Sequence, residues 1–552
     1  MMLRITELKL PLDHAEADLL TALVTKLGIR AEQVTRWEIF RRGYDSRKKA
    51  DIQLVYTLDI DVPPAVAAYL LKKFKRDANL MPTPDTSYKF VADAASLGTT
   101  HLRPVVIGFG PCGIMAALIL AQMGLRPIIL ERGKVGRERT LDTWALWRKS
   151  ELNTESNVQF GEGGAGTFSD GKLWTQTKDP KHYGRKVLQE FVAAGAPDEI
   201  LYVSKPHVGT FRLVKMVEHI RATIIALGGE FRFQHKVVDV EFETEETAKQ
   251  ICAVVTENAD GQRETLRTDH VVLAIGHSAR DTFKMLFDRG VHIEAKPFSI
   301  GFRIEHPQGL IDRARFGPSA GNAILGAADY KLVHHATNGR SVYSFCMCPG
   351  GTVVAATSEE GRVVTNGMSQ YSRNERNANA GIVVGITPDD YPGHPLAGIE
   401  FQQQWERRAY ELGGRNYYAP AQLVGDFVAG VASTALGGVE PSYKPGVTLT
   451  DLASALPDYA VTAIREAIPA FEKQIPGFFM MDAVLTGVET RTSSPIRITR
   501  RDDDLQSLNV RGLFPAGEGA GYAGGIMSAG IDGIRVAEAV ARSVVGYKST
   551  RT

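Results

Sequence analysis

One feature constrains this chain more than any other, a glycine-rich turn set between two apolar runs. The run at 105–107 is typical of a buried strand, and Gly108, Gly110 and Gly113 follow it at the Gly-x-Gly-x-x-Gly spacing. A helix rich in small residues and a second apolar run come next, and that run ends at Glu131. This strand–turn–helix–strand order predicts a dinucleotide site. The alternative is an ordinary glycine turn in an α/β sheet.

Each part of the predicted unit has a physical role. Gly108 permits the tight turn, Gly110 lets a pyrophosphate approach the backbone, and Gly113 lets the helix pack closely on the strand. The N-terminus of the helix offers free N–H groups and a partial positive charge to the phosphates. Glu131 can accept hydrogen bonds from ribose hydroxyls, which favours an adenosine without a 2′-phosphate. The motif alone leaves NAD and FAD open.

Length and composition bound the remaining possibilities. A chain of 552 residues is too long for one compact core. A content of 44% hydrophobic and 23% charged residues is typical of soluble proteins, and the net charge of +1 argues against strong global attraction to nucleic acid or membranes. Four cysteines suit a reducing compartment. With no signal-peptide pattern and no apolar run near ~20 residues, we expect a cytoplasmic protein that does not span a membrane.

The pattern along the chain predicts an α/β fold of several parts. These are a small α+β module at 1–90, a linker at 91–103, a Rossmann-type FAD-binding domain at 104–295 and 481–552, and an inserted, mostly antiparallel β substrate domain at 296–480. The module reads as a ferredoxin-like half, and Asp13 with Glu16 predicts a capping box before its first helix. Residues 77–103 show no sustained period and are expected to be a linker.

The N-terminal module is also rich in basic residues. They are Arg41, Arg42, Arg47, Lys48, Lys49, Lys72, Lys73, Lys75 and Arg76. Such a cluster either binds RNA or another acidic partner, or forms a solvated face, which is the usual role of a charge run. The net charge and the lack of interleaved aromatic residues favour the solvated face.

A second Gly-x-Gly-x-x-Gly occurs at Gly161, Gly163 and Gly166, without a buried strand before it or a helix after it. We expect this loop to present backbone N–H groups to an anion or a ring system, with a surface loop as the alternative. Another buried-strand pattern ends at Gly276. The next residue, His277, is predicted either to touch cofactor or substrate or to be a structural histidine.

Cys346 and Cys348 are two residues apart in a predicted strand. Residues i and i+2 of a strand share a face at a separation of ~6.6 Å, near the upper limit for a disulfide. A redox pair would be strained, and buried cysteines that pack as small hydrophobes are the alternative. Two thiols are too few ligands for zinc, so we predict no metal site. Cys112, inside the first turn, is expected to pack rather than react.

The C-terminal part decides between the two dinucleotides. Residues 512–519 form another strand pattern that ends in glycine and the acid Glu518, and residues 524–530 open a helix. An NAD-only domain does not need this second unit, whereas the longer FAD does. Glu518 can hold a ribityl hydroxyl, and the helix N-terminus can face the flavin edge that becomes negative on reduction.

These residues carry a family resemblance. The first turn, Glu131, residues 271–276 and residues 517–519 resemble the FAD domain of the glutathione reductase superfamily. Residues 161–172, 344–351, 366–369 and 515–529 are similar to a bacterial group of FAD-dependent dehydrogenases. The resemblance implies that the Val237 backbone lies near the adenine and that residues 163–166 and 525–527 flank the flavin. The chain departs from the disulfide reductases of the superfamily because no Cys-x-x-x-x-Cys pair follows the first turn.

The sequence therefore predicts an FAD-dependent oxidoreductase that acts on a small-molecule substrate. The expected cofactor contacts are Gly108, Gly110, Pro111, Cys112, Gly113, Glu131, Arg132, Gly163, Gly164, Ala165, Gly166, Val237, Ala274, Gly276, Gly517, Glu518, Gly525, Ile526 and Met527. Lys172, Arg303 and Arg491 are the candidates for substrate contact, because each is a cation expected near the flavin. No second nucleotide-binding unit is evident, so NAD(P)H as electron donor would dock transiently. The alternatives are an RNA- or partner-binding flavoprotein and an NAD-only dehydrogenase.

Overall fold

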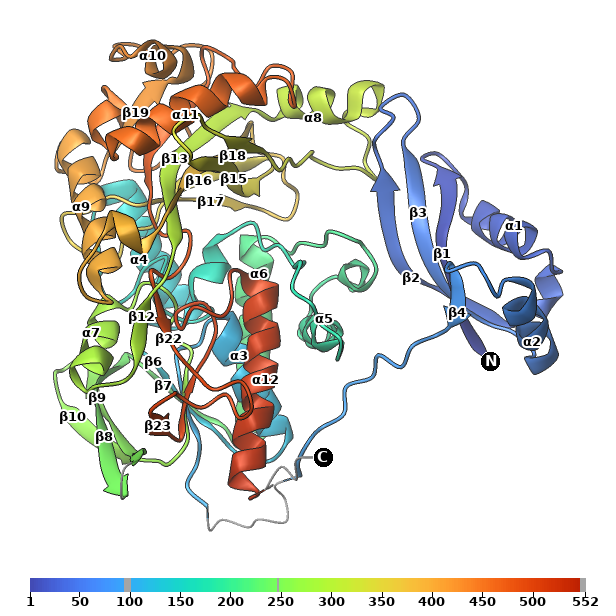
Figure 1. Ribbon diagram of the computed structural model, residues 1–552, viewed down its shortest axis with the longest axis horizontal. Helices are drawn as coiled ribbons and strands as arrows, with labels where there is room; N and C mark the ends of the chain where they lie inside the picture. Colours follow the sequence, from blue (N-terminus) through green and yellow to red (C-terminus); the bar gives the residue numbers. More distant parts are fainter. Residues whose placement is uncertain (94–100, 246–247, 547–552) are drawn as a thin grey trace.

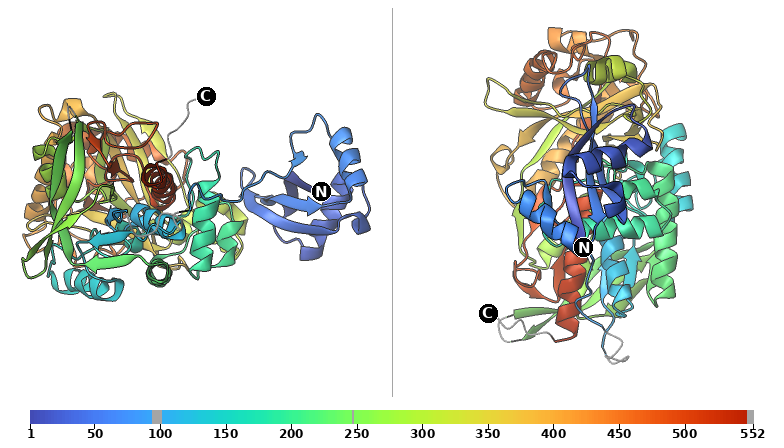
Figure 2. Two further views of the ribbon diagram at one scale, coloured as in Figure 1. Left: turned by 90° about the horizontal axis from the view of Figure 1, so that it is seen from below. Right: turned by 90° about the vertical axis from the view of Figure 1, so that its right-hand side faces the viewer.

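The computed structural model describes residues 1–93, 101–245 and 248–546 (Figure 1). They form a large body and a small N-terminal unit that stands off one side of it (Figure 2). The fold mixes parallel and antiparallel sheets. Among these described residues, no helix combines the length and the apolar character needed to cross a membrane.

The N-terminal unit is a four-stranded antiparallel sheet with two helices. Its elements are β1 (Met2–Pro11), α1 (Glu16–Leu27), β2 (Arg36–Asp45), β3 (Gln53–Asp61), α2 (Pro64–Lys73) and β4 (Leu80–Pro82). The strand order is β2-β3-β1-β4, and the element order is that of a ferredoxin-like unit. Alternation of apolar residues in β3 buries one face of the sheet against the helices.

Two local predictions for this unit were wrong. Strand β4 pairs with β1 inside the stretch that was expected to be a linker, because the sheet edge pairs with a run too short to show a period. Helix α1 has Ala15 as its N-cap, and the Ala15 N–H donates to Asp18 Oδ2 at 2.9 Å. The capping carboxylate is therefore Asp18, and no box of Asp13 with Glu16 forms.

The glycine-rich turn follows the central strand of a five-stranded sheet in the body, at the carboxyl end of that strand. The strands are β5 (Val105–Ile107), β6 (Ile128–Glu131), β7 (Glu230–Phe233), β11 (Val271–Leu273) and β24 (Leu513–Pro515). They are all parallel, in the order β24-β11-β5-β6-β7. Helices α3 (Pro111–Gln122) and α12 (Ile526–Val544) run side by side on this sheet (Figure 1). Residues 112–121 of α3 are all buried, because the helix is enclosed on every side.

A seven-stranded sheet forms the other half of the body. Its strands are β13 (Phe298–Pro307), β14 (Val333–His335), β15 (Ser341–Cys348), β18 (Asn377–Ile386), β19 (Ala419–Leu423), β20 (Val447–Leu449) and β21 (Val484–Glu489). The order is β14-β15-β18-β13-β21-β19-β20, and all neighbours are antiparallel except β19 and β20. Helix α11 (Asp458–Phe471) packs its apolar face on this sheet.

The remaining elements surround these two sheets. The helices are α4 (Gly136–Lys149), α5 (Tyr183–Ala193), α6 (Thr210–Ala226), α7 (Arg280–Asp288), α8 (Gln308–Phe316), α9 (Ala397–Leu412) and α10 (Val424–Ala429). The strands are β8 (His235–Glu245), β9 (Ala248–Asn258), β10 (Arg263–Arg267), β12 (Ile293–Ala295), β16 (Gly351–Ala355), β17 (Thr365–Ser369), β22 (Ile496–Ile498) and β23 (Val510–Arg511). Strands β8 to β10 form an antiparallel meander.

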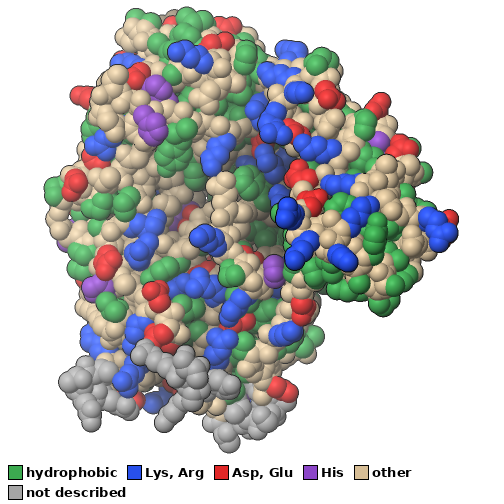
Figure 3. Space-filling view, turned by 45° about the vertical axis from the view of Figure 1, so that its right-hand side comes forward, with side chains coloured by type: hydrophobic (Ala, Val, Ile, Leu, Met, Phe, Trp, Pro, Cys, Tyr) green, Lys and Arg blue, Asp and Glu red, His purple; other side chains and the backbone are tan. Residues whose placement is uncertain are grey.

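The N-terminal unit contacts the body through the long hairpin of β2 and β3. The Arg42 N–H donates to Tyr202 O at 2.6 Å, and the Ser204 N–H donates to Arg42 O at 2.9 Å. Tyr44 packs edge-on against Phe316, with ring centroids 5.7 Å apart. Lys and Arg side chains gather along the seam between the unit and the body (Figure 3).

Candidate functional site

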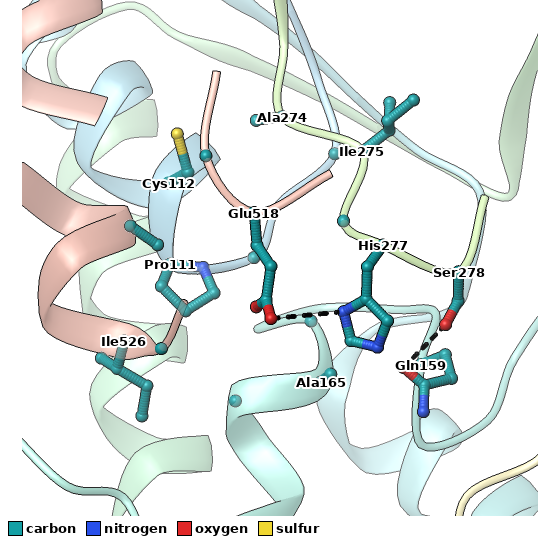
Figure 4. Close-up of a pocket in the computed structure, with 18 of the residues that line it drawn as sticks. Pro111, Cys112, Gln159, Ala165, Ala274, Ile275, His277, Ser278, Glu518 and Ile526 are labelled. Atoms are coloured by element: carbon teal, nitrogen blue, oxygen red, sulfur yellow. Dashed lines mark hydrogen bonds and ion pairs between the residues drawn. The ribbon is translucent and has the colours of Figure 1, made fainter. Parts of the chain in front are cut away.

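A cavity of about 410 Å³ opens at the edge of the parallel sheet where the glycine-rich turn lies (Figure 4). This volume is in the range of small-molecule and cofactor sites. Of the residues expected to contact cofactor, the cavity is lined by Gly108, Gly110, Pro111, Cys112, Glu131, Arg132, Gly164, Ala165, Gly166, Val237, Ala274, Gly276, Gly517, Glu518, Gly525, Ile526 and Met527. Gly113 and Gly163 lie behind this wall. Segments far apart in the sequence thus meet around one space.

The three glycines of the first turn have different surroundings. Gly108 has φ +94°, and a Cβ there would lie 2.4 Å from Ala274 O. A Cβ on Gly113 would lie 1.9 Å from Gly108 O, so only glycine lets α3 pack this closely on the turn. A Cβ on Gly110 would have an ordinary contact of 3.5 Å with Gly164 Cα. The first two positions are therefore structural, and Gly110 is the one whose side leaves backbone open to the cavity.

Glu131 holds the glycine loops together. Its Oε2 accepts the Phe109 N–H at 2.9 Å, and its Oε1 accepts the N–H groups of Gly133 and Gly161, each at 2.9 Å. The side chain is 5% exposed. A carboxylate has about four acceptor positions, so one remains for a ribose hydroxyl. Glu131 thus differs from the simple exposed ribose acceptor that the sequence suggests, because three backbone groups already bind it.

The second glycine loop packs directly on the first. The Gly163 N–H donates to Phe109 O at 2.8 Å, and a Cβ on Gly164 would lie 2.7 Å from Gly110 Cα. A short 3₁₀ helix follows at Ala165–Phe168. This loop is buried against the turn rather than displayed on the surface, and Gly164 and Gly166 line the cavity.

Arg132 and Val237 lie at the Glu131 end of the cavity. Arg132 is held by Asp281, with N–O distances of 2.9 and 3.0 Å, and by Glu155 at 2.8 Å from its Nε. Its guanidinium lies 4.1 Å from the centroid of the Phe160 ring. Val237 is buried at the start of β8. This end therefore offers an apolar wall and an ordered planar cation.

Glu518 and His277 face each other at the other end (Figure 4). Burial, together with Arg491 and Arg280, lowers the pKa of His277 to about 3, so the imidazole is neutral. Burial raises the pKa of Glu518 to about 7. Their closest atoms, His277 Nδ1 and Glu518 Oε1, are 3.7 Å apart, which is too far for a hydrogen bond. Within the described part of the chain, the Glu518 carboxylate makes no hydrogen bond.

Of the three candidate substrate cations, Lys172 has the most open position. It lines the cavity, its Nζ donates to Met347 O, and it lies 3.7 Å from Asp170 Oδ2. Burial opposes its charge, but Asp170 raises the pKa of Lys172 above its ordinary value. Lys172 therefore brings a positive charge to the wall formed by the end of β15.

Arg303, the second cation predicted to contact substrate, does not line the cavity. It is fully buried and lies behind the cavity wall. Its Nε and Nη2 donate to Glu489 at 2.7 and 3.1 Å, and its other donors bind Cys346 O, Asn379 Oδ1 and Asn366 Oδ1 at 2.8, 3.2 and 3.0 Å. All five N–H donors of the guanidinium are thus occupied. Position 303 looked suitable because a cation was expected near the flavin, but no residue of β13 lines the cavity, and the strand is buried from Phe298 to His306.

Arg491 lines the cavity, yet its donors are also occupied. Nε and Nη2 donate to Glu406 at 3.0 and 2.9 Å, and Nη2 also donates to Glu359 at 3.1 Å. Nη1 donates to the hydroxyls of Ser278 and Ser358 at 3.1 and 2.7 Å. The role of Arg491 at the cavity is therefore to fix its wall.

Arg491 belongs to a buried charge network that was not predicted from the sequence. Arg280 donates to Glu406 at 2.7 and 2.9 Å, to Gln402 at 2.9 Å and to Glu359. Although burial favours the neutral acid, Arg280 and Arg491 hold the pKa of Glu406 well below its usual range. No local pattern marks these residues, because the ion-pair partners lie at least 79 residues apart in the sequence.

The two cysteines of β15 are both free thiols. Cys346 lines the cavity with φ +41°, and β15 loses its register with β18 between Phe345 and Cys348. Cys348 is fully buried, and its Sγ lies 3.3 Å from Cys346 O. Cys112 is buried in the turn, and burial raises the pKa of its thiol well above the ordinary value, as expected of a packed cysteine.

Comparison with known proteins finds a relative over the whole chain and a family model over part of it. An uncharacterized protein of Clostridium beijerinckii is 46% identical over 551 residues, which covers 98% of each chain. Residues 297–492 match the family model described as FAD-dependent protein, C-terminal domain-like. The chain belongs to this family of FAD-dependent proteins. Residues 2–61 match a domain of unknown function.

Some solved flavoproteins are similar to this chain at low sequence identity. The Bacillus halodurans glycerol-3-phosphate dehydrogenase, complexed with FAD, is 13% identical, with coverage of 82% of this chain and 66% of that chain and a TM-score of 0.36. A Cytophaga hutchinsonii flavoprotein/dehydrogenase is 12% identical, with coverage of 81% and 80% and a TM-score of 0.34. At these values the similarity carries no argument about substrate.

Proposed function

We propose that the protein is an oxidoreductase that binds FAD non-covalently in the cavity described above. The observation that carries this proposal is that the N-termini of two helices, α3 and α12, open on one cavity (Figure 4). Free N–H groups and the positive end of the helix dipole make each N-terminus a site for negative charge. FAD has two such regions, the pyrophosphate and the pyrimidine edge of the flavin.

The residues of the cavity fit the other parts of FAD. Glu131 retains an acceptor position for ribose, and Glu518 presents a carboxylate without a hydrogen bond of its own. A Cβ added to Gly276, Gly524 or Gly525 would meet nothing within 4 Å, so the backbone there is open to a ligand. Val237 and Arg132 supply an apolar wall and a planar cation suited to adenine.

In this proposal each residue orients the cofactor or excludes water. Gly110 and Pro111 at the start of α3 hold the pyrophosphate, Glu518 holds a ribityl hydroxyl, and residues 164–166 and 525–527 enclose the flavin. A bound flavin supplies hydride or electron transfer at its N5 atom. The neutral His277 and the cation Lys172 are the groups left to meet a substrate, and NAD(P)H is the proposed transient donor.

The family match favours FAD over the NAD-only alternative. The shorter NAD would also not need the α12 end of the cavity. The parallel sheet and its glycine-rich turn support the finer assignment to the glutathione reductase superfamily, which remains part of the proposal.

The test is flavin content. The purified protein should be yellow and should release FAD, identified by chromatography, on denaturation. Gly110→Val should abolish this, because its side chain would occupy the space over the turn. Gly385→Val is the matched control, since a Cβ at Gly385 meets nothing within 4 Å and lies far from the turn on β18. Full flavin occupancy in Gly110→Val would contradict the assignment of the first turn.

A further inference from the structure

Cys346 and Cys348 stand in different surroundings although only one residue separates them. Cys346 is half-buried and lines the cavity, whereas Cys348 is fully buried. The irregularity of β15 at this point leaves one thiol at the cavity and the other in the interior. Gly367 makes room for the interior thiol, since a Cβ there would lie 2.9 Å from Cys348 Sγ.

The backbone around the two thiols is held by cations. Lys172 Nζ donates to the carbonyl of Met347, which lies between the cysteines, and Arg303 Nη1 donates to Cys346 O at 2.8 Å. Lys172 itself lines the cavity beside Cys346. This is the partly exposed, electropositive setting in which reactive cysteines are found.

Three acids also act on Cys346. Asp170 is paired with Arg373, Glu489 is paired with Arg303, and Glu518 belongs to another wall of the cavity. Because Asp170 and Glu489 are each bound to an arginine, Lys172 remains as the cation in excess. Burial raises the pKa of Glu518 to about 7, so below that pH three cations (Lys172, Arg303, Arg373) face two ionised acids near the thiols.

The two thiols differ in their acidity for the same reason. The neighbouring Cys348 thiol, together with Lys172 and Arg303, holds the pKa of Cys346 well below its usual range. The same contact and burial raise the pKa of Cys348 well above it. Cys346 is thus the more acidic thiol, at the cavity, and Cys348 is the less acidic thiol behind it.

We propose that Cys346 and Cys348 form a dithiol–disulfide exchange centre that reduces a small-molecule disulfide entering the cavity. The Cys346 thiolate attacks one sulfur, the substrate S–S bond breaks, and the departing thiolate takes the proton of the Cys348 thiol. The Cys348 thiolate then attacks Cys346 Sγ and releases the second half of the substrate as a thiolate. The substrate gains two electrons, and the pair ends as a Cys346–Cys348 disulfide.

Only the re-reduction of the cysteine pair rests on the proposed function. Returning the pair to its reduced form takes two electrons, and that part rests on a reduced flavin bound in the same cavity. The exchange step itself needs no flavin. A disulfide between residues two apart in a strand is close to the geometric limit, and strained disulfides are the more readily reduced ones.

The experiment measures thiol reactivity on the purified full-length protein, with its flavin content recorded separately. Iodoacetamide is added at pH 6, and alkylation of each cysteine is followed by peptide mass spectrometry. An ordinary cysteine is roughly 0.3% thiolate at this pH, whereas a cysteine of low pKa is largely ionised. A thiolate of low pKa is a weaker nucleophile, and after allowing for this Cys346 should still react about 10-fold or more faster than Cys252. Cys252, on β9, is the internal control, because it is also half-buried but lies beside the acids Glu241 and Glu243 of β8. Lys172→Met should slow Cys346 at pH 6 but not at pH 9.

The second arm uses hydroxyethyl disulfide. The wild type should become oxidised at Cys346 and Cys348 without keeping any of the reagent, and Cys348→Ser should keep it on Cys346. Equal alkylation of Cys346 and Cys252, or an adduct that persists on Cys346 in the wild type, would overturn the proposal. A protein that exchanges disulfide but binds no flavin would instead overturn only the proposed function.

Discussion

Removing the carboxylate of Glu131 separates two roles that the cavity gives this residue. In Glu131→Ala, the backbone N–H groups of Phe109, Gly133 and Gly161 lose their shared acceptor. A buried donor left unpaired costs about 1–3 kcal/mol, so three such groups set an upper range of about 3–9 kcal/mol. Water from the adjoining cavity will bind some of them, and we expect a net local cost of about 3 kcal/mol. That cost should loosen the contact between the two glycine loops.

Hydrogen exchange reports this loosening at the three amides. A local cost of about 3 kcal/mol corresponds to exchange roughly 100-fold faster, because every 1.4 kcal/mol is a factor of ten. The protein is measured without flavin, so ligand binding does not enter. Glu257→Ala is the control, since Glu257 forms a surface ion pair with Arg263, and such pairs contribute little.

The competing view is that Glu131 only holds ribose. In that case Glu131→Ala should weaken FAD binding by about 1.5–3 kcal/mol, the value of one hydrogen bond to a charged group, and leave the three amides unchanged. Unchanged exchange together with weaker binding would refute the reasoning from the structure. Faster exchange in protein without flavin supports it.

Two further predictions concern charge. Burial raises the pKa of Glu518 from 4.5 to about 7, so the folded protein holds this proton more tightly than the unfolded chain, and the stabilisation present below about pH 4.5 is lost as pH rises through about 7. Glu518→Gln should therefore be more stable than wild type by about 3 kcal/mol at pH 8 and nearly equal to it at pH 4.5. A difference in unfolding free energy between variant and wild type that is the same at both pH values, measured with urea, would contradict this. For the basic residues of the N-terminal unit, we expect only weak binding of labelled single-stranded RNA. Tight binding would favour the RNA-binding alternative if the logarithm of the binding constant fell with the logarithm of salt concentration at a slope of about −0.7 per phosphate contact.

The sequence predicted the elements that carry their own local signal. The turn at Gly108 to Gly113 could be read directly because a tight turn, a close helix contact and a strand-end acid must all fall within a few residues. Helix α12 was predicted for the same reason, since glycine followed by an apolar face marks a helix start. The three-residue strand β4 could not be predicted, because it exists only through its pairing with β1.

The partners of buried side chains could not be predicted from the sequence either. Arg303, Lys172 and Arg491 look alike in the sequence as cations near a predicted flavin site. Their roles differ because long-range packing occupies every donor of Arg303 and Arg491, while Lys172 keeps its place on the cavity wall. The carboxylate of Glu131 was likewise expected to face ribose, and only the return of the chain at Gly161 shows that backbone groups bind it first.

The network of Arg280, Glu406 and Arg491 bears on how this protein can be recombined with its relatives. Arg280 follows a strand of the parallel sheet, whereas Glu406 comes from α9 and Arg491 follows β21 of the antiparallel sheet. A chimera that takes the two sheets from different parents keeps these buried charges paired only if both parents carry this trio. Removing one partner of a buried ion pair destabilises the folded state by about 3–5 kcal/mol. A chimera with a mismatched crossover would therefore fail to fold before any loss of activity could be measured. The three positions should therefore be inherited as one block, even though more than two hundred residues separate the first from the last.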